Sequence, residues 1–417
     1  MRTNFVHLFG MPLDQITSEC SNNDLSFQIM PVQEHKVDNN QWYLVYQPVS
    51  LKLDNKLHEI GNTCANRIWV DLVINHMANG EGVGNFGSRF NSRNREYDQM
   101  DYNDFHNVNM DMDYNDRWKS QNCDLLSLPD LNTGRYETQW KIANALQEIN
   151  SAQVQGVRID AAKHISVNDL RGIYDKVQKK SLLFQEVIPS GGITTQEYAS
   201  LGYVTELGYG YRIRDVFRNR KLFELRNIQN GLLESSKAII TVINHDQERS
   251  EGNLLNYRDG YLYLFANYFT LFNDYGMVAI HSGFGFNSFD QSSSKYECTF
   301  WENDRLSNEG FHCLHRHPYL VVLMRLRDQL ENEKVQFVHS SQNTVVLKRG
   351  KYVLMMNIGD NTENVNLSLG NRRVASLLGD KSPIRGDIGN YRPYKHYKTI
   401  DNNYQLNGRT VELFELE

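Results

Sequence analysis

The 417-residue sequence lacks the features that would direct it to nucleic acid or to a membrane. Its formal net charge is only −6, which argues against nucleic acid or an anionic bilayer as a main partner. No apolar run reaches the length that spans a bilayer. The first residues, MRTNFVHLFG, lack the hydrophobic core of a signal peptide. Either the protein is not exported or the chain is a mature or recombinant form.

Cysteine is scarce as well. None of the five cysteines belongs to a CxxC pair, so we do not expect a structural zinc site. The odd number leaves at least one thiol free if the others form disulfides, and alone it does not identify the compartment.

The hydrophobic content of 40% and the aromatic content of 11% fit a globular protein. The length allows one large domain with a satellite, or two to three domains.

Short apolar runs recur along the chain and alternate with segments that have helical periodicity. In WKIANALQEI, for example, Ile142, Leu146 and Ile149 repeat at the spacing of one helix face. Buried strands that alternate with helices predict a parallel sheet, and eight of them predict an α/β fold of the closed (β/α)8 barrel type. The predicted strands cover residues 4–9, 25–32, 67–74, 156–160, 181–188, 202–207, 237–243 and 276–282.

The spacing of the strands predicts the domain organisation. Glu186 follows Asp160 by one barrel unit, but the interval from Asp71 to Asp160 is far too long for one. We therefore expect a loop-rich inserted domain at 78–124, after the third strand, with the barrel at 1–77 and 125–329. A disordered acidic loop is the alternative, but interleaved aromatic residues favour a folded, ion-bound segment. Over 330–417, alternating apolar and polar residues predict a C-terminal antiparallel β-sandwich domain.

Three carboxylates stand at strand ends, where a barrel carries its active site. Any one of Asp160, Glu186 and Asp246 alone would be interpreted as a strand-end cap or a salt-bridge partner. Three at barrel spacing instead indicate catalysis. Such a set suits glycoside hydrolysis, in which one carboxylate attacks the anomeric carbon and a protonated one protonates the leaving oxygen. A third helps to keep the acid protonated, because like charges raise a carboxyl pKa.

Short segments around these residues add a specific resemblance. DLVINHM (71–77), GVRIDAAKH (156–164), FQEVI (184–188) and INHDQ (243–247) resemble, in order, the four signature regions of the α-amylase family of glycoside hydrolases. LPDLN (128–132) resembles its fifth region. Other segments are similar to animal-type members of the family: VHLF (6–9), YQPVS (46–50), TELGYG (205–210) and HCLHRH (312–317). One region alone would be weak evidence, whereas the ordered set is specific and spans nearly the whole chain.

The resemblance implies a role for each matched residue. Asp160 matches the nucleophile, Glu186 the general acid/base and Asp246 the transition-state stabiliser. The implied substrate-binding residues include a sugar platform in which Tyr43 replaces a Trp. Without the family match, that aromatic cluster would be interpreted as core packing. The implied substrate-binding set is Trp42, Tyr43, Tyr46, Gln47, His76, Arg158, Lys163, His164 and His245.

The resemblance also implies a structural calcium ion that joins the inserted domain to the barrel. Asn75 and Asp130 match its side-chain ligands, and backbone carbonyls are expected from His164 and from the segment around Gln121. Asn122 stands where the family has an Asp ligand. Hard oxygen donors suit Ca²⁺, but the lost charge would weaken its binding.

We do not expect the chloride ion that animal-type members hold beside the acid/base. Arg158 and Asn244 match two of its ligands. Ala279, however, occupies the position of the third, and no lysine or arginine lies between 273 and 294.

In light of the resemblance, Cys20 and Cys64 match a disulfide of animal-type amylases. Cys313 matches half of another, with Cys298 as a plausible partner, and no partner is found for Cys123. Two disulfides would imply an oxidising compartment, so we expect a secreted protein. We also expect it to be a monomer.

The resulting hypothesis is a retaining, endo-acting α-amylase that hydrolyses α-1,4 bonds of starch or glycogen. The alternative hypothesis within the enzyme class is an exo-acting maltase or a transglycosylase of the same fold. A non-catalytic relative that only binds a glucan or a protein is a further alternative, against which the intact carboxylate set argues.

Overall fold

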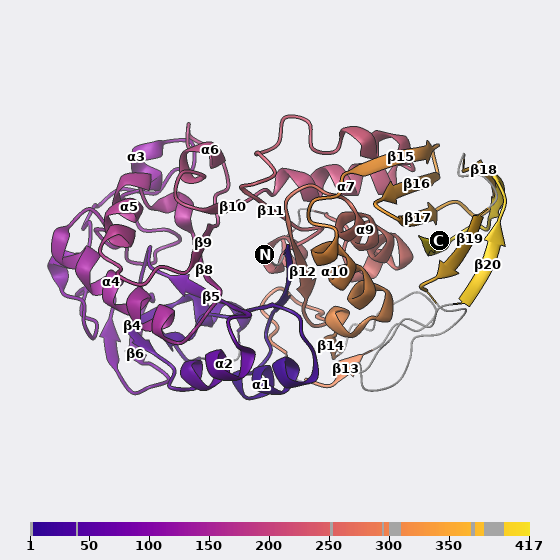
Figure 1. Ribbon diagram of the computed structural model, residues 1–417. Coiled ribbons are helices and arrows are strands. Elements are labelled where there is room, and N and C mark those ends of the chain that lie inside the picture. Colours follow the sequence, from indigo (N-terminus) through magenta and orange to yellow (C-terminus); the bar gives the residue numbers. More distant parts are fainter. Residues whose placement is uncertain are drawn as a thin grey trace.

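Eight parallel strands close a barrel in the order β1-β12-β11-β10-β9-β8-β5-β2 (Figure 1). The computed structural model describes residues 3–38, 41–250, 253–293, 296–299, 310–367, 372–378 and 396–417. Each barrel strand lies within one of the eight predicted runs, so the predicted (β/α)8 barrel is confirmed. The strands are β1 (Asn4–Leu8), β2 (Phe27–Ile29), β5 (Ile68–Val73), β8 (Gly156–Asp160), β9 (Leu182–Gln185), β10 (Tyr203–Thr205), β11 (Ala238–Ile240) and β12 (Met277–Ser282).

The barrel interior is filled by side chains rather than open. One buried cluster combines Phe5, Trp69, Phe184, Ile239 and Met277 from different strands. Trp69 is paired in register with Gly156 on β8, and a Cβ at that glycine would lie 2.2 Å from the Trp69 ring. The indole therefore requires a glycine on the neighbouring strand.

Helices surround the barrel and bury the faces that their periodicity predicts. In α4 (Tyr136–Ser151), Ile142, Leu146 and Ile149 are all buried, as the sequence pattern indicates. Nearly all of α9 (Tyr261–Phe272) is buried, and it packs against α10 (Pro318–Gln329). The other long helices are α1 (Leu13–Asn22), α2 (Lys56–Cys64), α5 (Val167–Asp175) and α7 (Gly208–Arg218). Within the described ranges, none of the helices combines the length and apolarity needed to cross a membrane.

Two excursions interrupt the barrel, one between β2 and β5 and the other between β5 and β8. The first was not predicted: β3 (Gln33–His35) and β4 (Pro48–Leu53) form an antiparallel pair that encloses the 3-10 helix η1 (Trp42–Tyr46). The second follows β5 and has little regular structure, comprising the hairpin of β6 (Glu81–Val83) and β7 (Arg89–Asn91), η2 (Tyr102–Asp104) and α3 (Arg117–Ser120). It falls in the segment predicted as an inserted domain, whose boundaries at 78–124 stay a prediction.

Buried Asp104 fastens the second excursion to the start of α4. Its carboxylate accepts hydrogen bonds from Arg135 at 2.8 Å and from Thr138 at 2.7 Å. A buried carboxylate is stable there because these partners replace its water.

The C-terminal part is a sandwich of antiparallel strands at one end of the molecule, at the right of Figure 1. Its larger sheet has the order β15-β16-β17-β22-β19-β20, and β18 and β21 form a smaller sheet. A core that includes Val353, Phe414, Val365 and Leu406 joins the two sheets, which confirms the predicted sandwich. The strands are β15 (Val335–Ser340), β16 (Thr344–Arg349), β17 (Tyr352–Asn357), β18 (Glu363–Asn366), β19 (Arg372–Ser376), β20 (His396–Ile400), β21 (Asn403–Leu406) and β22 (Thr410–Leu416).

Both predicted disulfides are present. Cys20–Cys64 joins α1 to α2, and Cys298–Cys313 closes a segment after β12. Cys123 is a buried free thiol.

Loss of a disulfide should cost more stability when the loop that it closes is longer. The chain-entropy model gives about 4 kcal/mol for the 44-residue separation of Cys20 and Cys64 and about 3 kcal/mol for the 15-residue separation of Cys298 and Cys313. Cys20→Ala/Cys64→Ala should therefore lower the free energy of unfolding, measured by urea denaturation, more than Cys298→Ala/Cys313→Ala. The reverse order would mean that native-state contacts, rather than loop length, set the contribution.

Candidate active site

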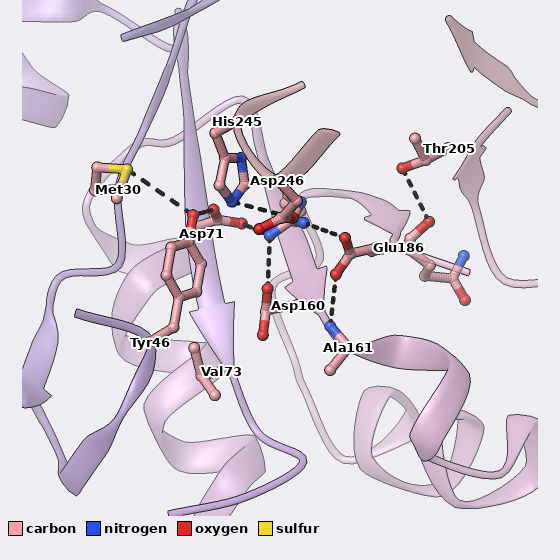
Figure 2. Close-up of polar contacts among 12 residues, drawn as sticks. Met30, Tyr46, Asp71, Val73, Asp160, Ala161, Glu186, Thr205, His245 and Asp246 are labelled. Atoms are coloured by element: carbon pink, nitrogen blue, oxygen red, sulfur yellow. Dashed lines mark hydrogen bonds and ion pairs between the residues drawn. The ribbon is translucent and has the colours of Figure 1, made fainter. Parts of the chain in front are cut away.

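The site is organised around the guanidinium of Arg158 on β8. Its Nη1 lies 2.8 Å from Oδ1 of Asp71 and 3.0 Å from Oδ1 of Asp160, and its Nη2 lies 3.0 Å from Oε1 of Glu186 (Figure 2). The side chain is only 5% exposed. Three carboxylates from three strands thus share one buried cation, which explains why a buried strand tolerates charge.

Asp71 on β5 is the most deeply buried of these carboxylates, with no exposed side-chain surface. It is paired in register with Arg158. Its Oδ2 accepts hydrogen bonds from the Tyr46 hydroxyl at 2.8 Å and from the Gln28 amide at 3.4 Å. In the sequence, Asp71 served to measure strand spacing and as the first residue of DLVINHM, and no task was predicted for it. The structure shows it as a counter-ion of Arg158 beneath the cleft.

The turn after β8 orients Glu186. Ala161 adopts a left-handed backbone conformation, with φ of 49° and ψ of 30°, which is costly for a residue with a Cβ. In this conformation its N–H donates to Oε2 of Glu186 at 2.9 Å. Such strain directly after Asp160 is typical of a functional site.

Asp246 reaches the same place from the short helix α8 (His245–Arg249). The side chain of Asn244 caps this helix by accepting a hydrogen bond from the Gln247 N–H at 2.8 Å. Oδ2 of Asp246 lies 3.3 Å from Nε2 of His245. The capped helix therefore holds Asp246 and His245 in one arrangement at the end of the β11 segment.

The pKa values of Asp160 and Asp246 are raised, first by burial and then by the charge of Glu186. Burial raises the pKa of Asp160 well above its ordinary value, the charge of Glu186 raises it further, and Arg158 opposes both. Desolvation and then Glu186 also raise the pKa of Asp246, although its side chain is 48% exposed and solvent screens part of the effect. Because the groups titrate together, the cluster as a whole retains a proton to higher pH than isolated carboxyls would.

A cleft of about 620 Å³ opens above the carboxylates. Asp160, Glu186 and Asp246 line it, as does every predicted substrate-binding residue except Arg158, which lies beneath. The His245 ring stacks on Tyr46 with a centroid distance of 5.3 Å and an interplanar angle of 7°. Trp42 and Tyr43 form a wall with Phe289.

Two buried histidines in this region are held neutral. Nε2 of His76 donates to the Tyr46 carbonyl at 3.0 Å, and burial lowers the pKa of His76 to about 4. Burial also lowers the pKa of His245 well below its ordinary value. A neutral His245 can donate a hydrogen bond to a sugar hydroxyl without adding charge to the cleft. The single N–H of neutral His76 is already donated to the Tyr46 carbonyl.

Several cleft residues were not found by sequence reasoning. They are apolar or aromatic side chains on loops: Tyr114, Leu125, Leu126, Leu128, Ile188 and Phe289. Leu126 is 75% exposed and Ile188 is 53% exposed, so both present apolar surface at the cleft. The Lys163 ammonium lies 4.8 Å from the centroid of the Tyr114 ring. Leu128 and Ile188 belong to the matched segments LPDLN and FQEVI, which could have identified them. No local pattern in the sequence distinguishes the other four from ordinary surface positions.

The residues predicted to hold calcium are partly brought together. Residues 75–77 pair with 129–131, so Asn75 and Asp130 lie on adjacent segments. Oδ2 of Asp130 contacts Nδ1 of His106 at 2.6 Å, while its buried Oδ1 has no hydrogen-bond partner among the described residues. A buried carboxylate oxygen without a partner fits a hard cation.

The remaining predicted calcium ligands lie on facing segments. Nδ1 of His164 donates to the Ser120 carbonyl at 2.7 Å, and the Gln121 amide donates to the Lys163 carbonyl at 3.3 Å. The Asn122 amide instead donates to the Trp118 carbonyl at 2.8 Å. Across the part of the chain that the structure describes, no group of three or more His, Cys, Asp or Glu side chains could hold a metal. A site here would therefore depend on Asp130, Asn75 and carbonyl oxygens.

A separate small cavity of about 40 Å³ is lined by Ala279, the residue predicted to replace a chloride ligand. His7, His245 and His281 line it together with Arg158 and Asn244. Burial lowers the pKa of His7 well below its ordinary value, as it does for His245. His281 is paired with Glu248, with 3.0 Å between Nε2 and Oε2. The guanidinium of Arg158 is already surrounded by carboxylates, so the cavity offers an anion no uncompensated positive charge.

Comparison with known proteins gives these features a context. No family model matches the chain. It is 30% identical over 403 residues to an α-amylase of Hypothenemus hampei, covering 87% of this chain and 83% of the relative. It is also 30% identical over 412 residues to an α-amylase of Tenebrio molitor, covering 88% and 87%.

Solved structures agree on the fold. The crystal structure of α-amylase I from Eisenia fetida matches with a TM-score of 0.80 at 23% identity, covering 100% of this chain and 95% of that chain. A maltohexaose complex of a mutant of that protein matches with a TM-score of 0.81. Because the two curated relatives are matched over more than four fifths of their length, the chain belongs to the α-amylase family of glycoside hydrolases.

Proposed function

We propose that this glycoside hydrolase is an endo-acting α-amylase that cleaves internal α-1,4 bonds of starch or glycogen with retention of configuration. One observation carries the proposal. Asp160, Glu186 and Asp246 line a cleft of about 620 Å³, and Arg158 ties the first two together. Carboxylates grouped in a cleft are the machinery of glycosidases, and the family resemblance, in which Asp160 matches the nucleophile, supports retention.

Each carboxylate has a distinct task in this mechanism. Asp160 attacks the anomeric carbon while Glu186 protonates the glycosidic oxygen, so the C–O bond breaks and a covalent glycosyl–enzyme forms. Glu186 then takes a proton from a water molecule, which attacks the same carbon and releases Asp160. Asp246 and His245 hydrogen-bond the sugar hydroxyls and stabilise the oxocarbenium-like transition state. Two inversions at one carbon leave the configuration unchanged.

Long glucans are the substrate that the cleft favours. Trp42, Tyr43 and Phe289 offer ring surface, and Leu126 and Ile188 expose further apolar surface from other loops. Sugar rings present apolar faces that pack on such surfaces, so several glucose units can be held at once. The maltohexaose complex of the Eisenia fetida protein is consistent with a substrate of this size.

The products formed from soluble starch test the mode of attack. Endo cleavage predicts a rapid loss of iodine staining, together with mixed maltooligosaccharides early in the reaction. Release of glucose alone, while iodine staining persists, would instead identify an exo-acting maltase. Products longer than the donor substrate would identify a transglycosylase.

We expect Asp160→Asn and Glu186→Gln to fold normally and to lose nearly all hydrolysis. Nucleophile and proton donor act as a unit, so either change should lower kcat by roughly 10⁴-fold or more. Asp215→Asn, which changes an exposed carboxylate, serves as the control and should keep wild-type activity. A tenth of the wild-type rate in either site variant would overturn the assignment.

We also propose that a calcium ion held by Asp130, Asn75 and carbonyls of the facing segments joins the inserted segment to the barrel. EDTA should then lower Tm more than it changes KM, because an ion that binds only the folded state stabilises it by mass action. Asp130→Asn should abolish the EDTA-dependent shift in Tm, whereas Asp101→Asn on the surface should preserve it. An unchanged Tm at saturating chelator would contradict the proposed calcium site.

Activity should not depend on chloride. Ala279 contributes no charge to the small cavity, and the carboxylates of Asp71, Asp160 and Glu186 already compensate Arg158. Dialysed enzyme should therefore hydrolyse starch equally well with chloride, nitrate or acetate at equal ionic strength. Several-fold activation specific to chloride would refute this prediction.

The protein is further proposed to be a secreted monomer. Its two disulfides are typical of an oxidising compartment.

A further inference from the structure

Arg249, the last residue of α8, is a buried cation with an unusual environment. Its side chain has no exposed surface, and none of its three guanidinium nitrogens has a hydrogen-bond partner among the described residues. Among the described residues, the one carboxylate within 4.0 Å of the guanidinium is Glu248, whose Oε2 lies 3.8 Å from Nη1. That same oxygen lies 3.0 Å from His281, so Glu248 does not serve Arg249 alone.

Aromatic rings surround the guanidinium instead. Its Cζ lies 4.2 Å from the ring centroid of Phe286, 4.5 Å from Phe284, 4.9 Å from Phe9 and 5.3 Å from Trp42. Burial of an unpaired charge is costly, whereas cation–π attraction strengthens when water is excluded. The four rings therefore supply the stabilisation that hydrogen bonds normally supply.

This cluster connects two parts of the catalytic apparatus. Trp42 lines the cleft, and its Nε1 donates to the Phe289 carbonyl at 2.8 Å. Asp246 lies on the same short helix as Arg249. Phe9 contacts both Trp42 and His245, with ring-centroid distances of 5.4 Å and 4.9 Å. The guanidinium therefore touches the aromatic wall of the cleft on one side and belongs to the helix that carries Asp246 on the other.

We propose that Arg249 is a positioning residue: its guanidinium clamps the Trp42 indole to α8, so that the sugar platform and Asp246 keep a fixed separation. The kinetic part of this inference rests on the proposed glucan hydrolysis, whereas the clamp itself does not. A misplacement of about 1 Å can cost on the order of 10²-fold in rate, so loss of the clamp should be visible in KM and in kcat.

A double-mutant cycle between Arg249→Met and Trp42→Phe tests the coupling. Arg249→Met removes the charge but keeps a long apolar side chain, and it should lower kcat/KM on a maltooligosaccharide by roughly 10- to 100-fold with a raised KM. If Arg249 acts through Trp42, the double variant should be little worse than Trp42→Phe alone. Additive losses, or a lower Tm with unchanged KM in the folded enzyme, would overturn the proposal.

Arg258→Met is the matched control. Arg258 also lies over the Phe286 ring, at 4.4 Å, but it is exposed and belongs to η5 (Tyr257–Asp259) rather than to α8. Its loss should leave kcat/KM unchanged. If Arg249→Met fails to fold, Arg249→Lys replaces it in the cycle, because a compact ammonium keeps the charge but covers fewer rings.

Acrylamide quenching tests the clamp without any substrate. The fluorescence of Trp42, obtained as the difference between each protein and its Trp42→Phe counterpart, should be quenched several-fold more efficiently in Arg249→Met than in the wild type or in Arg258→Met. Equal quenching in all three would overturn the clamp. A wild-type enzyme that hydrolyses no glucan would overturn the proposed function, and the quenching result would still decide the clamp.

Discussion

The ion pairs of Arg158 are the constraint on which the rest of the site depends. A hydrolase of this kind needs several carboxylates in one place, and their mutual repulsion and desolvation oppose that arrangement. One buried guanidinium within 3.0 Å of Asp71, Asp160 and Glu186 offsets both. Asp71 does not reach the cleft, so its charge holds Arg158 in place while the other two carboxylates remain available to substrate.

The barrel supplies this arrangement through strand register. Asp71 pairs with Arg158 and Val73 with Asp160. On β5 the counter-ion Asp71 therefore stands two residues before the position that pairs with the proposed nucleophile. Segments outside the strands add what the barrel lacks. In the first excursion, η1 supplies the Tyr46 hydroxyl that bonds Asp71 at 2.8 Å, and α8, which follows β11, presents Asp246. Arg249 is a second buried cation that connects parts of the site: in our proposal it joins the aromatic wall of the cleft to α8.

Sequence spacing alone could predict the barrel, the sandwich and the three carboxylates, because strand periodicity and strand-end polarity are local signals. The β3–β4 pair was missed because β3 has only three residues and the apolar run Trp42–Tyr46 between the strands forms a 3-10 helix. Phe289 and the ring cluster around Arg249 were missed for another reason. Some of their contacts join segments more than 200 residues apart, such as Trp42 and Phe289 at 5.9 Å, and no local pattern encodes them.

The central claim is that Asp160 and Glu186 act in succession on one anomeric carbon. The most direct test is proton NMR of the products in the first minutes of maltohexaose hydrolysis, before mutarotation equilibrates the anomers. Double displacement predicts that the newly formed reducing ends appear first as the α-anomer and drift towards the β-anomer later. Initial appearance of the β-anomer would mean single displacement by water, and it would contradict the assignment of Asp160 as nucleophile.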